Sequence, residues 1–216
     1  MISMRMHRGE PVDDLMARSE AIAAEISDPS VAADVLSDRG SLALVAGDYA
    51  EAARLELAAA GLGSQITHVY LSFAIRGLVL AGDLDGARAA AARHREEAPG
   101  NSIDVALGIA AAAGIAALEG RRDEAIEGYR EAIARLSAIH MDWIVALLGF
   151  EFVQVIGADH PATREAAAGS RAIFERIGAR PWLAKLDAAT AAPARQVGAQ
   201  GPGSASRREP VETPQA

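Results

Sequence analysis

The chain has 216 residues, of which half are apolar and only 4% are aromatic, and its net charge is −8. The absence of cysteine excludes disulfides, thiolate nucleophiles and cysteine-ligated metal sites. Alanine dominates the apolar residues, which favours closely packed helices over strands, and the negative charge disfavours a nucleic-acid partner.

The beginning of the chain lacks the apolar stretch of a secretory signal, so residues 1–11 are predicted to be a flexible N-terminus. The longest apolar run extends from Trp143 to Gly157 and is interrupted by Glu151 and Gln154. A membrane span needs about 20 apolar residues. We therefore expect no membrane partner and a cytoplasmic location.

Ten helices are predicted from the hydrophobic periodicity between residues 12 and 190. Their expected ranges are 12–26, 30–46, 49–60, 65–80, 84–97, 102–119, 122–138, 141–156, 161–177 and 181–190. The first of them is expected to bury an apolar face made of Val12, Leu15, Met16, Ile22 and Ile26. Asp28 and Pro29 form a helix start, with Asp28 as the cap and Pro29 at the first helical position.

A short pattern recurs in these helices: an apolar helix, a glycine, a polar turn, and an alanine five residues after the glycine. The glycines are Gly47, Gly82, Gly120 and Gly157, which lie 35, 38 and 37 residues apart. Glycine can adopt the left-handed conformation that ends a helix, and Asp48 is placed to cap the helix that follows it. Such a period is typical of helix–turn–helix repeats.

The helix after Gly120 carries the most regular apolar stripe, formed by Ala125, Ile126, Tyr129, Ala132, Ile133 and Leu136. The helix before it contains Gly108 and Gly114, which we interpret as sites of close helix packing. From Ala191 onward, Pro, Gly, Ser, Gln and Arg replace this periodicity, so 191–216 is predicted to be a disordered tail.

The third unit resembles a tetratricopeptide repeat, because Gly120, Ala125, Tyr129 and Ala132 occupy the glycine, alanine, aromatic and alanine positions of that family. The other units match less well, and none has the family's tryptophan. The resemblance implies an all-α, right-handed superhelical α-solenoid of tetratricopeptide-like repeats over residues 12–190. It also implies a non-catalytic module that binds a protein or peptide in a concave groove and is compatible with homo-oligomers.

The segment from Arg171 to Leu183 resembles the C-terminal end of bacterial signalling ATPases of the adenylate/guanylate cyclase-like and LuxR-type families. Their repeat arrays follow a P-loop ATPase domain, whereas this chain has no G-x-x-x-x-G-K-[ST] motif. The alternative function is therefore an orphaned or truncated sensory tail of such a regulator.

In tetratricopeptide arrays the first helices of successive units line the groove, so the resemblance assigns ligand contacts to their polar residues that lie outside the core. These residues are Asp34, Ser37, Ser41, Ser72, Arg76, Glu151 and Gln154. Arg76, Glu151 and Gln154 are the most informative, because each is a polar residue in an apolar helix and burial without a partner is costly. The competing interpretation is that such residues face solvent or pair internally.

Catalytic and metal-binding motifs are not found, so no cofactor and no metal are expected. The five histidines include no H-E-x-x-H or other ligand spacing. His140 and Asp142 are the most suggestive pair, although an Asp at a helix start is ordinary. An enzyme on a helical scaffold remains a less favoured hypothesis, which a pocket joining His140 and Asp142 to a third polar group would support.

Overall fold

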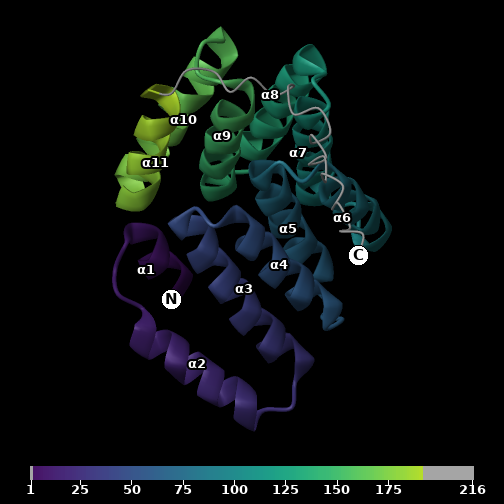
Figure 1. Ribbon diagram of the computed structural model, residues 1–216, viewed down its shortest axis with the longest axis vertical. Coiled ribbons are helices and arrows are strands. Elements are labelled where there is room, and N and C mark those ends of the chain that lie inside the picture. The colour runs from purple at the N-terminus through teal and green to yellow at the C-terminus, as the bar shows by residue number, and fades with distance from the viewer. Residues whose placement is uncertain (1, 192–216) are drawn as a thin grey trace, which may run out of the picture.

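The computed structural model describes residues 2–191, which form eleven helices and no strand (Figure 1). The helices are α1 (Ile2–Arg8), α2 (Asp13–Glu25), α3 (Pro29–Ala46), α4 (Tyr49–Gly61), α5 (Thr67–Ala81), α6 (Leu84–Glu97), α7 (Ser102–Leu118), α8 (Arg122–Ala138), α9 (Asp142–Ile156), α10 (Pro161–Ile177) and α11 (Arg180–Ala191). The last ten agree with the predicted helices to within two residues at each end. In this part of the chain no helix combines the length and the apolar character that would let it cross a membrane.

The predicted helix boundaries form for the expected reasons. Gly47 and Gly82 follow α3 and α5 with φ angles of +92° and +81°, the left-handed conformation that ends a helix. Asp48 accepts a hydrogen bond from the Glu51 backbone N–H at 3.2 Å, and Asp28 accepts one from Ser30 at 2.8 Å. Each turn therefore satisfies backbone groups that the helix ends leave unpaired.

Small residues set the distance between neighbouring helices. A Cβ atom added at Gly77 of α5 would lie 2.9 Å from the backbone nitrogen of Ala53 in α4. A Cβ added at Gly114 of α7 would lie 2.8 Å from Val79 of α5, as the interpretation of close packing requires. Gly108 differs from that interpretation, since a Cβ there would meet nothing within 4 Å.

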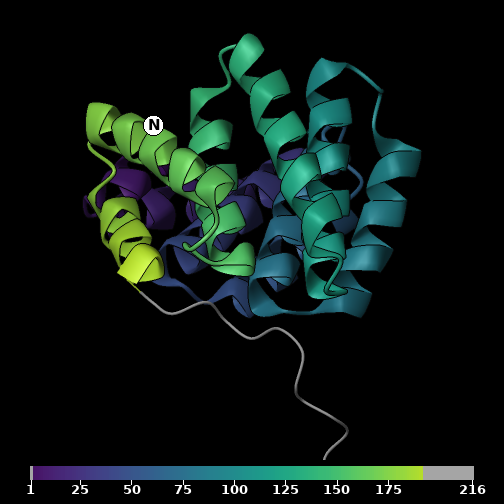
Figure 2. The ribbon, with the colours of Figure 1, turned by 90° about the horizontal axis from the view of Figure 1, so that it is seen from above.

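The core runs across the helix pairs rather than staying within each pair. The predicted stripe of α8 is buried, with Tyr129 and Leu136 inaccessible to solvent. A second cluster joins distant parts of the chain, from Leu44 of α3 through Phe150 of α9 to Trp182 of α11. The first and last described helices thus pack into one structure, and α1 lies beside α11 in Figures 1 and 2.

The N-terminus differs from the prediction of a flexible segment over residues 1–11, because Ile2–Arg8 forms α1. Met6 and His7 are 2% and 6% exposed, and α1 packs against α3 and α11. A helix of seven residues is too short to be stable alone. Tertiary contacts stabilise this helix. Contacts of this kind produce little regular spacing of apolar residues, so the sequence does not indicate the helix.

The first predicted helix, α2, buries less of its apolar face than expected. Val12 and Met16 are buried, but Ile22 and Ile26 are each 47% exposed. Helix α2 lies at the outer edge of the molecule beside α3 (Figure 1), so only one side of it is covered and these side chains stay about half exposed. The predicted disordered tail lies, apart from Ala191, outside the described residues.

Candidate functional site

Two of the predicted groove residues form a buried ion pair. Arg76 Nε donates to Glu151 Oε2 at 3.1 Å, and the Tyr129 hydroxyl donates to Glu151 Oε1 at 2.7 Å. Both charged side chains are only 4% exposed. Burial raises the pKa of Glu151, while Arg76 and the Tyr129 hydrogen bond oppose that rise. Arg76 and Glu151 therefore pair internally and do not line a groove.

The reason is that the first helices of the second and fourth units, α5 and α9, pack directly against each other. The hollow that remains beside Arg76 and Glu151 is about 10 Å³, barely the space of one water molecule. An open concave groove for a peptide is absent at this point of the described chain.

The other predicted groove residues do not converge on one site. Asp34 accepts a hydrogen bond from the Tyr70 hydroxyl at 2.7 Å, whereas Ser72 donates to the Val69 carbonyl one turn earlier in its own helix. The three remaining residues lie apart from these. Ser37 donates a hydrogen bond to Glu56, whereas the side chains of Ser41 and Gln154 are partly exposed and make no hydrogen bond in the described chain.

Glu56 of α4 is a buried acid that the predicted site did not include. It is 3% exposed, and it accepts a hydrogen bond from Ser37 at 3.0 Å. Its other oxygen, Oε2, has no partner, and burial raises the pKa of its carboxyl to about 8. Its position between Leu55 and Leu57 was the signal for it, because a glutamate stands there at the repeat's aromatic position.

Replacing Glu56 by Gln is expected to change how stability depends on pH. Between its ordinary pKa of 4.5 and its folded pKa of about 8, the folded protein holds a proton at Glu56 that the unfolded chain releases. Stability then falls as pH rises through this window, with a slope approaching about 1.4 kcal/mol per pH unit.

Urea unfolding across this window should show a weaker pH dependence for Glu56→Gln than for the native protein, and a more stable variant at the alkaline end. Equal slopes for the two proteins would contradict the buried, protonated state of Glu56.

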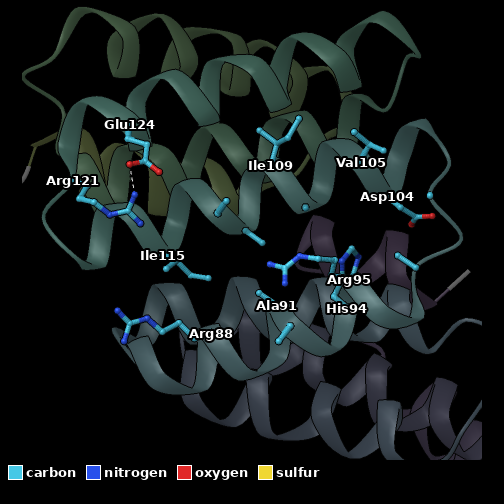
Figure 3. Close-up of a pocket in the computed structure, with 16 residues that line it drawn as sticks. Arg88, Ala91, His94, Arg95, Asp104, Val105, Ile109, Ile115, Arg121 and Glu124 are labelled. Atoms are coloured by element: carbon cyan, nitrogen blue, oxygen red, sulfur yellow. Dashed lines mark hydrogen bonds and ion pairs between the residues drawn. The ribbon is translucent and has the colours of Figure 1, made fainter.

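A cleft with a volume of about 660 Å³ lies between α6 and α7 (Figure 3). We call it the α6–α7 cleft. Small residues leave room for it, since seven of its sixteen lining residues are alanine or glycine: Ala91, Ala92, Ala98, Ala111, Ala112, Gly100 and Gly108. Gly108, whose Cβ position is open, therefore faces the cleft. The volume falls within the range of ligand pockets.

Arginines surround the α6–α7 cleft. Arg88 and Arg121 both bind Glu119, the former at 2.5 Å, and Arg121 also pairs with Glu124. Arg95 has no ion pair in the described chain, and its side chain extends into the space between the two helices (Figure 3). The cleft therefore presents one arginine without an ion-pair partner among the described residues.

The α6–α7 loop end of the cleft is polar and incompletely bonded. His94 and Asp104 are 3% and 5% exposed, and neither His94 Nε2 nor Asp104 Oδ2 has a hydrogen-bond partner. His68 Nε2 lies 3.7 Å from Asp104 Oδ1, too far for a good hydrogen bond. Burial lowers the pKa of His94, so its ring is neutral. Unpaired buried polar atoms cost free energy that a new partner would offset.

A second cavity, of about 360 Å³, lies where the two ends of the chain meet, and we call it the terminal cavity. It brings together His140, Asp142 and His7, the combination that would support an enzyme. No hydrogen bond joins these three in the described chain. Asp142 Oδ2 instead accepts from Arg176 at 2.6 Å, so no proton relay is assembled.

Sequence reasoning did not select Arg95, His94, Asp104 or Gly108 as site residues. Arg95 and His94 belong to a charged stretch of a second helix, where solvated surface is the ordinary interpretation. The available signal was the run of small residues in α6 and α7. It indicated close packing of these helices and not a cleft between them.

Comparisons with protein-family models, with curated proteins and with solved structures found no match to this chain. In the described residues, no group of three or more His, Asp or Glu side chains is arranged to hold a metal ion. A function for the chain must therefore be argued from its geometry.

Proposed function

We propose that the protein is a non-catalytic binding module whose α6–α7 cleft takes an extended, acidic segment of a protein partner. The observation that carries this proposal is the open cleft of about 660 Å³ between two helix pairs, lined by small residues and carrying an unpaired Arg95. The site thus differs from the concave groove that the family resemblance implied.

We also propose that the helix pairs are degenerate tetratricopeptide repeats in a right-handed superhelix. The regular pairing of α3 with α4, α5 with α6, α7 with α8 and α9 with α10 supports this relationship. So do the left-handed glycines at the turns and the buried stripe of α8. In such an array the cleft lies between the second and third units.

The chemistry of the cleft favours an acidic peptide as the occupant. Its walls expose mainly methyl groups, which suits side chains of modest size along an extended backbone. Arg95 offers a guanidinium, which binds carboxylates with two hydrogen bonds.

Replacing Gly108 by Leu is expected to abolish peptide binding while leaving the fold intact. The Cβ of the new side chain meets no protein atom within 4 Å, and the rest of the leucine occupies space in the cleft that the ligand needs. Leucine also favours a helix interior over glycine by about 0.5–1 kcal/mol, so the variant should melt no lower than the native protein.

The measurement is selection from a displayed random-peptide library, followed by titration of an enriched peptide by calorimetry. Gly169→Leu in α10 is the matched control, because a Cβ at Gly169 also meets open space, away from the cleft. Acidic peptides should bind the native protein and Gly169→Leu, and Arg95→Glu should weaken them at least about tenfold. Failure to enrich acidic sequences, or equal binding by Gly108→Leu, would refute the proposal.

A further inference from the structure

The terminal cavity is independent of the α6–α7 cleft and has a different character. Its walls are mainly apolar side chains from α1, α9, α10 and the turns before α9 and after α10: Met4, Met141, Trp143, Ile144, Ile173, Ile177 and Ala179. Its volume of about 360 Å³ lies at the lower end of the range for small-molecule pockets. The cavity therefore suits one small ligand rather than a peptide.

Several contacts build this cavity from the first and the last described helices. The His7 ring lies against Trp143 in a tilted arrangement with centroids 4.1 Å apart, and Trp182 Nε1 donates to His7 Nδ1 at 3.2 Å. Arg8 Nε donates to the Ile177 carbonyl at 2.9 Å, across 169 residues of sequence. The cavity exists only while α1 remains packed against the C-terminal helices.

The polar side chains at its wall are His7, Arg8, His140 and Asp142. Burial lowers the pKa of His7 to about 4, so the ring is neutral. Its Nδ1 accepts from Trp182, which places the ring hydrogen on Nε2, and no protein acceptor takes that hydrogen in the described chain. Arg8 adds further N–H groups, while the acid at the wall, Asp142, is bound by Arg176.

We propose that the terminal cavity binds a small apolar molecule, aromatic or branched, that carries a carbonyl or carboxylate oxygen. The apolar body fills the space beside Trp143, and the oxygen accepts from His7 Nε2. A cationic group is disfavoured by Arg8 and by Arg176, which already binds Asp142. Because the ligand contacts α1, α9 and α10, its binding stabilises the packing of α1 against these helices.

The test compares two probes of the same shape and opposite polarity, 4-phenylbutyrate and 4-phenylbutylamine, by calorimetry with the full chain. We expect 4-phenylbutyrate to bind at least about tenfold more tightly than the amine and to raise the melting temperature. Both tryptophans of the chain contact His7, so binding should also change the intrinsic fluorescence.

Two variants locate the binding. Ile177→Phe fills the cavity and should weaken 4-phenylbutyrate at least about tenfold, whereas Ile66→Phe, at an exposed position of the α5 cap, should not. Met4→Glu places a carboxylate at the half-exposed edge of the cavity and should also weaken the probe, without disturbing buried packing. Gly108→Leu should bind the probe normally, which separates this site from the cleft.

The proposal is overturned if neither probe binds, if the amine binds as tightly as the acid, or if Met4→Glu and Ile177→Phe both retain full affinity. Thermal melting of the unliganded variants shows which of them fold. If Ile177→Phe does not fold, Met4→Glu alone decides the location.

Discussion

Replacing Glu151 by Ala is expected to lower the free energy of unfolding by about 3–5 kcal/mol, one of the two largest effects we predict for a single substitution in this chain. The substitution leaves the Arg76 guanidinium buried among apolar helices with no counter-charge. It also removes the acceptor of the buried Tyr129 hydroxyl. Chemical unfolding with urea at neutral pH measures the difference.

The matched control is Glu131→Ala in α8. Glu131 is also a helical glutamate paired with an arginine, Arg135, at 2.7 Å, but both side chains are about half exposed. Exposed pairs of this kind contribute about 0.3–0.5 kcal/mol. Similar losses in the two variants would mean that the Arg76–Glu151 pair is as well solvated as a surface pair.

A compensated variant separates the cost of a lone charge from the value of the pair. Arg76→Met with Glu151→Leu and Tyr129→Phe replaces the whole network by apolar side chains. Buried networks of this kind are often replaced with little loss or with a gain of stability. Recovery of most of the stability lost in Glu151→Ala would show that the network confers specific helix pairing rather than net stability. Arg76 Nη1, which lacks a partner even in the native protein, favours that outcome.

Local features of the fold were predictable because they depend on neighbouring residues. A few neighbouring positions specify the turn at Gly47 and Asp48 and the apolar stripe around Tyr129. Helix boundaries follow from such signals to within two residues. The packing of α1 was not predictable, since it depends on His7 meeting Trp182, 175 residues later.

The site was less predictable, for a geometric reason. Gly108 and Gly114 lie six residues apart in α7, and at about 100° per residue they face directions about 120° apart. Gly114 meets α5, while Gly108 opens the α6–α7 cleft. The sequence shows two small residues in one helix, but it does not show which of them packs against a neighbouring helix.

The residues predicted to line a groove illustrate the same limit. A polar side chain in an apolar helix signals a constraint, and Arg76 and Glu151 were correctly singled out by it. The partner of each is the other, 75 residues away. A groove contact and a buried pair produce the same sequence pattern, so only the packing of α5 against α9 distinguishes them.

Trp182→Ala is expected to lower the free energy of unfolding by about 3–5 kcal/mol, through lost burial and the cavity that remains. Trp182 is completely buried, stacks on Phe174 with centroids 5.9 Å apart, and meets Phe150 edge-on at 5.5 Å. The adjacent Leu183→Ala is the control, because Leu183 is only partly buried and should cost less.

The effect of Trp182→Ala should be unequal along the chain. Helical arrays ordinarily open from their ends, but here α1 and α11 close on each other through the Trp182–His7 hydrogen bond. Without Trp182, the seven-residue α1 loses a main support and is too short to persist alone. Hydrogen exchange should then show α1 unprotected while the amides of α8 and α9 remain protected. Retained protection of α1 in this variant would show that its contacts with α3 suffice, and that the closure of the two ends does not hold the N-terminus.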